Sequence, residues 1–283
     1  MILIADSGST KTDWVIIDNE LNIQLPFSSK GLNPNILTAH EIADILKSIE
    51  AFNSINTKIE TVFFYGAGCS GNAIVIIESA LKNVFPDAQV KIKNDLFAAA
   101  QATCWNDNGI VCILGTGSNS CYYDGKDITG ENLSLGFILG DEAGGVYFGK
   151  RLLRDYFYGL LPTDLHEKFS NQYNISREEA IENIYRKKAS SEFIASFLPF
   201  YKENINHPYC NYFLNYGFEE FLKIFVWRFK NYEDTPVHFI GSVAFYFKDV
   251  LIEACENLKI KTGKIIRSPI MDLASFHLDQ LKN

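Results

Sequence analysis

"IADSGSTKTDW" (residues 4–14) joins two apolar stretches through a short polar turn. Residues 1–6 and 13–18 have the apolar content of two buried strands, and the turn between them is built mainly from small and hydroxylated residues. Such a turn exposes backbone N–H groups and hydroxyls with little side-chain bulk, as the binding of a polyphosphate requires. The segment therefore predicts a hairpin whose turn is either a phosphate-binding loop or an ordinary hairpin turn.

Two charged residues of this turn have alternative interpretations. Asp6 ends the first apolar strand, and a carboxylate there is costly unless it accepts hydrogen bonds or meets a cation. A Mg²⁺ ion held largely through water would meet that need, and so would an Asx turn that caps the hairpin. Lys11 either contacts phosphate or is solvated.

The segments that follow alternate between strand and helix patterns. Up to residue 107 we expect strands at 21–27, 59–68 and 88–95, and helices at 38–52, 70–85 (begun by a serine cap) and 96–105. The strand-turn-strand pattern returns at 109–125, and the region 145–232 has mostly helical spacing. The last elements expected are a strand at 237–244 that ends in a third small-residue turn, a helix at 245–258, a strand at 263–269 and a helix at 271–281.

This order of elements indicates an α/β protein with a duplicated fold unit. We expect one domain at 1–107 and a second at 108–283 that carries a helical insertion at about 145–232. The chain has 283 residues, 47% of them hydrophobic, which is enough for two cores.

Charge and cysteine content exclude several classes of function. A net charge of −8 disfavours binding to nucleic acid or to an anionic membrane surface. No apolar run approaches the roughly 20 residues of a spanning helix, and the short apolar N-terminus lacks a basic flank, so we expect a cytoplasmic protein. The six cysteines form no C-x-x-C pair, which argues against a zinc or iron–sulfur site held within one chain and favours free buried thiols.

Further carboxylates stand where chemistry is often placed. Asp95 comes at the end of a predicted strand and before an alanine-rich helix, so it is either the helix N-cap or a catalytic base that accepts the proton of an attacking hydroxyl. Asp141 and Glu142 follow an apolar run in "LGFILGDEAGG" (135–145). They would accept hydrogen bonds from carbohydrate hydroxyls or form a solvated acidic turn.

Taken together, these segments resemble the sugar-kinase, Hsp70 and actin superfamily, and more closely the BadF/BadG/BcrA/BcrD ATPase family with its N-acetylglucosamine kinases. "DSGSTKTDW" resembles the first phosphate motif, "ILGTGSNS" the second and "GSVA" near 241 the adenosine-side turn. "LGDEAGG" is similar to the family's L-G-D-E-G-[SA]-G segment, and "GLNPN" (31–35) stands where these kinases carry a sugar-contacting loop. Two departures are Ser7 in place of a glycine and "EAGG" in place of "EGSG".

The resemblance implies two ribonuclease H-like lobes of the actin and hexokinase type, each with a mixed five-stranded sheet, with the nucleotide in the cleft between them. It also implies that the last helix packs back on the N-terminal lobe, that Asp95 is the general base and that Asp6 faces Mg²⁺ through water. The implied nucleotide- and phosphate-binding residues are Ser9, Thr10, Lys11, Gly115, Thr116, Gly117, Ser118, Gly241, Ser242 and Ala244. The implied sugar-binding residues are Asn35, Thr116, Gly117, Asp141 and Glu142.

The function implied is that of an ATP- and Mg²⁺-dependent kinase that phosphorylates the 6-hydroxyl of N-acetylglucosamine or a related hexosamine. Its partner would be a small amino sugar, and the family resemblance leads us to expect a homodimer. One alternative is an activator ATPase of the 2-hydroxyacyl-CoA dehydratase type, in which cysteines of two subunits share one iron–sulfur cluster. The other is a sugar-sensing regulator without catalytic activity.

Overall fold

The computed structural model describes residues 1–53, 55 and 58–282, so the last residue of the expected second domain, Asn283, lies outside it. The chain divides into two compact units. Unit 1 contains residues 1–107, 125–127 and 268–283, and unit 2 contains residues 108–124 and 128–267. Within the described residues, no helix is long and apolar enough to cross a membrane.

Unit 1 is built on a mixed five-stranded sheet of order β3-β2-β1-β4-β5. β2 is antiparallel to both β1 and β3, whereas β4 is parallel to both β1 and β5. Its elements are β1 (Ile2–Ser7), β2 (Lys11–Ile17), β3 (Phe27–Lys30), α1 (Ala39–Lys47), α2 (Glu50–Asn53), β4 (Thr61–Gly66), α3 (Ala73–Val84), β5 (Gln89–Asn94), α4 (Asp95–Thr103) and α14 (Ile270–Lys282).

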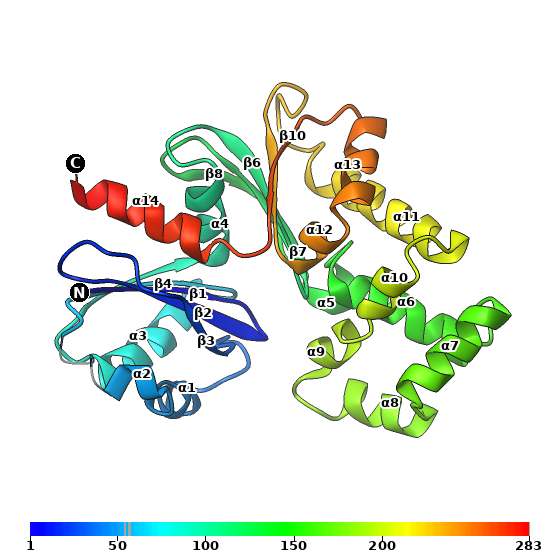
Figure 1. Cartoon of the computed structure of the whole chain (residues 1–283), viewed down its shortest axis with the longest axis horizontal. Helices are drawn as coiled ribbons and strands as arrows, with labels where there is room; N and C mark the ends of the chain where they lie inside the picture. The colour runs from blue at the N-terminus through cyan, green and yellow to red at the C-terminus, as the bar shows by residue number, and fades with distance from the viewer. Residues whose placement is uncertain (54, 56–57, 283) are drawn as a thin grey trace. The chain divides into compact units, whose positions relative to one another are not determined.

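The sheet of unit 1 is covered on both faces. In Figure 1, α1, α2 and α3 lie on one face and α4 and α14 on the other. Alternate side chains of β1, Leu3 and Ala5, join Trp14 of β2 in the core beneath α1 and α3. β1 is thus a buried strand whose side chains point alternately to the two helical layers, in agreement with its apolar sequence.

Unit 2 repeats the sheet. Its order is β10-β9-β6-β7-β8, and its strand directions match those of unit 1 strand for strand. Its elements are β6 (Gly109–Leu114), β7 (Ser118–Tyr123), β8 (Ile128–Glu131), α5 (Gly136–Leu139), α6 (Gly145–Phe157), α7 (Thr163–Tyr173), α8 (Arg177–Tyr185), α9 (Ser190–Ala195), α10 (Pro199–Glu203), α11 (Pro208–Phe225), β9 (Val237–Ile240), α12 (Ser242–Tyr246), α13 (Lys248–Asn257) and β10 (Thr262–Ile266). The predicted α/β class with two mixed five-stranded sheets is confirmed.

The strand predicted at 21–27 is wrong. The edge strand of unit 1 is β3, and in the predicted range Ile23 forms only an isolated bridge to Ile17. The Asp18 carboxylate accepts hydrogen bonds from the backbone N–H groups of residues 20 and 22, which holds the start of the range in a turn. Pro26 lacks the N–H that a paired strand needs.

Two predicted helices differ from the structure, one in its length and the other in its N-cap. The helix predicted at 38–52 is divided, because α1 ends with Ser48 as its C-cap and a separate short α2 follows. Its start is confirmed by a capping box, in which the Thr38 hydroxyl accepts from the Glu41 N–H and the Glu41 carboxylate accepts from the Thr38 N–H. The serine cap predicted for the next helix is wrong, because α3 begins after Asn72 and has no side-chain cap bond.

Candidate functional site

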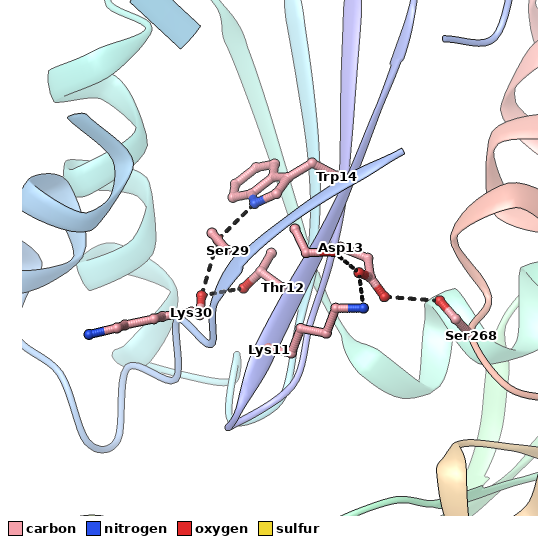
Figure 2. A network of polar contacts seen from close by, with 8 residues as sticks. Lys11, Thr12, Asp13, Trp14, Ser29, Lys30 and Ser268 are labelled. Carbon is pink, nitrogen blue, oxygen red and sulfur yellow. Dashed lines mark hydrogen bonds and ion pairs between the residues drawn. The ribbon is translucent and has the colours of Figure 1, made fainter. Parts of the chain in front are cut away.

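The predicted phosphate loop is the turn between β1 and β2 in unit 1. The Gly8 N–H donates to the Lys11 carbonyl oxygen at 2.9 Å and closes the turn. Beneath it, the buried Ser7 and Thr12 hydroxyls are hydrogen-bonded to each other at 2.8 Å. Figure 2 shows that Thr12 also donates to the Lys30 carbonyl oxygen of β3. Ser7 therefore contributes to the packing under the loop.

The segment after β3 holds the same loop from its other side. The Gly31 N–H donates to the Thr10 carbonyl oxygen at 3.0 Å, and the Leu32 N–H donates to the Ser7 hydroxyl at 3.1 Å. Any side chain on Gly31 would overlap the Ser9 carbonyl group, so only glycine permits this approach. The loop and the "GLNPN" segment are therefore held together by direct hydrogen bonds and close backbone packing.

The lysine of the loop is paired with an aspartate. Lys11 Nζ lies 2.6 Å from Asp13 Oδ1, and the Lys11 side chain remains more than half exposed. The Asp13 carboxylate also accepts hydrogen bonds from the hydroxyls of Ser28 at 2.7 Å and Ser268 at 3.1 Å. Figure 2 shows that Asp13 thereby connects β2 to the segment that leads into α14.

Asp6 and Asp95 lie at the end of the unit 1 sheet where its parallel strands have their carboxyl ends. β1, β4 and β5 are parallel, Asp6 lies near the carboxyl end of β1, and Asp95 follows directly after β5. Burial, the Asp95 charge and then the Asp13 charge raise the pKa of Asp6 to about 8, although Lys11 opposes this. The two carboxylates are therefore close enough to influence each other's charge.

The Asp6 carboxylate suits a cation better than an Asx turn. Among the residues that the structure describes, none donates a hydrogen bond to this carboxylate, and burial and neighbouring negative charges raise its pKa. The same residues contain no group of three or more His, Cys, Asp or Glu side chains that could enclose a metal ion. A single carboxylate of this kind could serve only a cation that takes most of its oxygen ligands from elsewhere, as Mg²⁺ does when it is bound through water and phosphate.

The helix N-cap alternative for Asp95 is wrong. The N-cap of α4 is Asn94, whose side chain accepts a hydrogen bond from the Phe97 N–H at 3.2 Å, and Asp95 is the first residue of the helix. Capping therefore does not explain a carboxylate at position 95.

In unit 2, the second small-residue loop meets the acidic turn. The Gly145 N–H donates to the Gly115 carbonyl oxygen at 2.8 Å, and the Val146 N–H donates to the Thr116 carbonyl oxygen at 3.0 Å. The Ser118 hydroxyl donates to the Glu142 carbonyl oxygen at 2.7 Å. The turn between β6 and β7 is thus attached to the start of α6 along its whole length.

Asp141 lies directly against this loop. Its side chain accepts from the Ser118 N–H at 3.3 Å, and a Cβ on Gly117 would lie 2.5 Å from Asp141 Oδ2. Burial raises the pKa of Asp141, while the Ser118 N–H and the Lys150 charge oppose this. Burial also lowers the pKa of Lys150, while the Asp141 and Glu142 charges oppose this. The acidic turn is therefore not simply solvated, because a lysine of α6 and the loop backbone surround it.

The third small-residue turn lies beside the second. Gly241 has φ +120°, and a Cβ there would overlap the Leu114 carbonyl oxygen at the end of β6. Its N–H donates to the Ile266 carbonyl oxygen at 3.0 Å. Ser242 begins α12 and is exposed, whereas Ala244 is buried. Unit 2 thus brings together the predicted residues near 115, 141 and 241.

Comparison with known proteins places the chain in a family. No protein-family model and no curated protein sequence matches it. A solved structure from Porphyromonas gingivalis, described as a "Putative N-acetylglucosamine Kinase", is 37% identical, with a TM-score of 0.93 over 99% of this chain and 100% of that chain. The chain belongs to this family of sugar kinases.

Other solved structures share the fold of this sugar kinase. One from Chromobacterium violaceum, described in the same words, has a TM-score of 0.72 and 16% identity over 97% of this chain and 98% of that chain. A ROK family glucokinase from Streptomyces griseus, in complex with glucose and AMPPNP, has a TM-score of 0.56 and 16% identity over 99% and 98% of the two chains.

The structure of the kinase also reveals residues that sequence reasoning missed. Asn33 is hydrogen-bonded to Ser9, and Gly68, with φ +76°, lies against the side chains of Asn33 and Asn35. Lys150 is the basic residue whose charge interacts with the acidic turn. The position of Asn33 in "GLNPN" was the only sequence signal for any of them.

Proposed function

We propose that this sugar kinase transfers the γ-phosphoryl group of ATP to the 6-hydroxyl of N-acetylglucosamine or a related hexosamine. The relative from Porphyromonas gingivalis, at 37% identity, supports the choice of sugar class. The glucokinase with bound AMPPNP shares the fold and supports the choice of nucleotide.

The observation that carries the proposal is the pair Asp6 and Asp95 at the carboxyl edge of the unit 1 sheet, beside the glycine-closed loop. In the proposed step the Asp95 carboxylate accepts the 6-hydroxyl proton while that oxygen attacks the γ-phosphorus. The bond from phosphorus to the ADP oxygen breaks, so the products are the sugar 6-phosphate, ADP and a proton. A general base of this kind contributes about 10²- to 10⁴-fold to the rate.

The other predicted residues have roles that suit their positions. In unit 1, the loop residues Ser9, Thr10 and Lys11 would contact the phosphates and Asn35 the sugar. Residues of unit 2 proposed for the phosphates and adenosine are Gly115, Thr116, Gly117, Ser118, Gly241, Ser242 and Ala244, and those proposed for sugar hydroxyls are Thr116, Gly117, Asp141 and Glu142. Asp6 would hold Mg²⁺ through water, and the ion would supply charge neutralisation at the phosphates.

The burial of the cysteines argues against the activator alternative. A cluster shared between two subunits needs cysteine thiolates at the surface of each. All six cysteines lie among the described residues, where each is buried and forms no disulfide, and the most accessible is 4% exposed. Burial and the Asp95 charge also raise the pKa of Cys69 to about 12, which opposes formation of its thiolate.

Asp95 also argues against a regulator without activity. A sugar sensor has no use for a general base, and the N-cap of α4 is supplied by Asn94 instead. An acidic side chain in the first turn of α4 also interacts favourably with the helix dipole, but the kinase step needs a carboxylate at this position and a sugar sensor does not.

The test is an ADP-release assay with Mg-ATP and a panel of glucose, glucosamine, N-acetylglucosamine, N-acetylmannosamine and N-acetylmuramic acid. We expect turnover on an amino sugar, and we expect Asp95→Asn to lower kcat about 10²-fold or more while nucleotide binding persists. The matched control is Asn94→Ala, which removes the neighbouring cap, costs about 1 kcal/mol of stability and leaves most of the turnover. If no sugar raises ADP release above background hydrolysis, the proposed function is wrong.

A further inference from the structure

Asn33 makes two hydrogen bonds from opposite ends of one amide group. Its Nδ2 donates to the Ser9 hydroxyl oxygen at 3.0 Å, and its Oδ1 accepts from the Asn35 backbone N–H at 3.0 Å. Because a backbone N–H can only donate, the amide oxygen must face Asn35, and the amide nitrogen therefore faces Ser9. The planar amide thus holds Ser9 and Asn35 at a set separation.

The backbone around Asn33 restricts this side chain. Pro34 follows it, is buried and disfavours a helical conformation at position 33. The Asn33 carbonyl oxygen accepts from the N–H groups of Ile36 and Leu37, each at 3.0 Å. A Cβ on Gly68 would lie 2.9 Å from Asn33 Oδ1, so the loop after β4 closes over the amide. The amide therefore has little room to move without changing its contacts with both Ser9 and Asn35.

The directions of these hydrogen bonds leave the Ser9 hydroxyl free to donate its proton to one more acceptor. Since Ser9 Oγ accepts from Asn33, its own proton is directed to another acceptor, and a phosphate oxygen is an acceptor of this kind. A hydroxyl that donates becomes a better acceptor, because successive hydrogen bonds polarise one another. A phosphate bound at Ser9 would therefore strengthen the Asn33 bond and fix the position of Asn35.

We infer that Asn33 is a positioning residue that couples nucleotide binding at the phosphate loop to sugar binding at Asn35. The inference rests on the proposed function, which assigns Ser9 to phosphate and Asn35 to sugar. The backbone bonds of Gly31 and Leu32 hold the start of the same segment, but the contact that reaches from the loop to Asn35 is the Asn33 amide. Each ligand then raises the affinity for the other by the same factor.

The test is calorimetric titration of N-acetylglucosamine in the absence and in the presence of saturating Mg-AMPPNP, which does not require turnover. The coupling factor is the ratio of the two Kd values. We expect Asn33→Ala to lower this factor by about 2- to 10-fold, as loss of one hydrogen bond implies. Ser9→Ala should lower it similarly, and the double variant should lose no more than the single variants, because both remove the same bond.

The matched control is Asn72→Ala, which changes an exposed asparagine of unit 1 whose side chain forms no helix-cap bond. Its coupling factor should equal that of the wild type. If Asn33→Ala does not fold, Ser9→Ala tests the same bond from the other side.

Three outcomes distinguish the claims. Variants that weaken each ligand alone but keep the wild-type coupling factor would show that Asn33 is merely structural, and the inference is then wrong. A wild-type protein that shows coupled binding without turnover would leave the inference intact and refute the kinase step. A wild-type protein that binds AMPPNP and none of the sugars in the panel would refute both.

Discussion

The buried histidine of α14 predicts how the stability of unit 1 depends on pH. His277 Nε2 lies 2.9 Å from the Tyr65 hydroxyl, which itself donates to Gln101 Oε1 at 2.7 Å, so the imidazole is the donor to Tyr65. Burial, together with the charges of Lys91 and Lys93, lowers the pKa of His277 to about 4. The side chain is only 7% exposed.

The direction of the effect follows from proton linkage. In the unfolded chain this histidine titrates near 6.5, so between pH 6.5 and 4 the unfolded state binds a proton that the folded state does not. The contribution of the neutral His277 to the free energy of unfolding is therefore complete above pH 6.5 and is lost as the pH falls toward 4. With a pKa of 6.5 in the unfolded state and about 4 in the folded state, the free energy of unfolding falls by about 2 kcal/mol between pH 7 and pH 5.

The assay is urea unfolding at pH 7 and pH 5, followed by tryptophan fluorescence. The chain has three tryptophans, and a Trp227→Phe background leaves Trp14 and Trp105, which both belong to unit 1. His277→Gln in this background removes the titrating group and should reduce the loss of unfolding free energy by about 2 kcal/mol. An equal loss in both proteins would refute the argument, since other groups would then account for it.

Two further predictions concern the loops. Gly241→Ala places a Cβ against the Leu114 carbonyl at φ +120°, so we expect a loss of about 2–4 kcal/mol in the unfolding free energy of unit 2; an unchanged denaturation curve would contradict this. Asp13→Asn removes the charge that competes with phosphate for Lys11, so the Kd for Mg-AMPPNP should fall about 2- to 5-fold by calorimetry, whereas weaker binding would show that Asp13 orients Lys11 for the nucleotide.

Much of the fold was predictable because its signals are local. An apolar strand that ends in small residues and returns as an apolar strand indicates a hairpin whatever the rest of the chain does. The two hairpins at 4–14 and 109–125 indicated the duplicated sheets, and the helical spacing that begins at Thr38 indicated the start of α1. The missed edge strand at 27–30 has no comparable pattern, because two serines and a lysine pair there only where β2 offers its free edge.

The site was predictable in its residue types and not in its contacts. Asp95 is conspicuous as a carboxylate between a strand and a helix, but two adjacent residues there can serve as the N-cap, and only the structure shows that Asn94 does so. Asn33 lies in the "GLNPN" segment, but that segment does not indicate its contact with Ser9, which lies 24 residues earlier in the chain.

The sequence by itself determined most of the elements, the two hairpin turns and the places of Asp6, Asp95 and Asp141 at strand ends and turns, since strand periodicity and small-residue turns are properties of neighbouring residues. The tertiary structure decided which groups meet. The Ser268 hydroxyl reaches Asp13 across 255 positions, and Ser118 holds the acidic turn across 24. Such contacts depend on how sheets and helices pack, and the residues next to each partner in the sequence do not indicate a hydrogen bond to a distant residue.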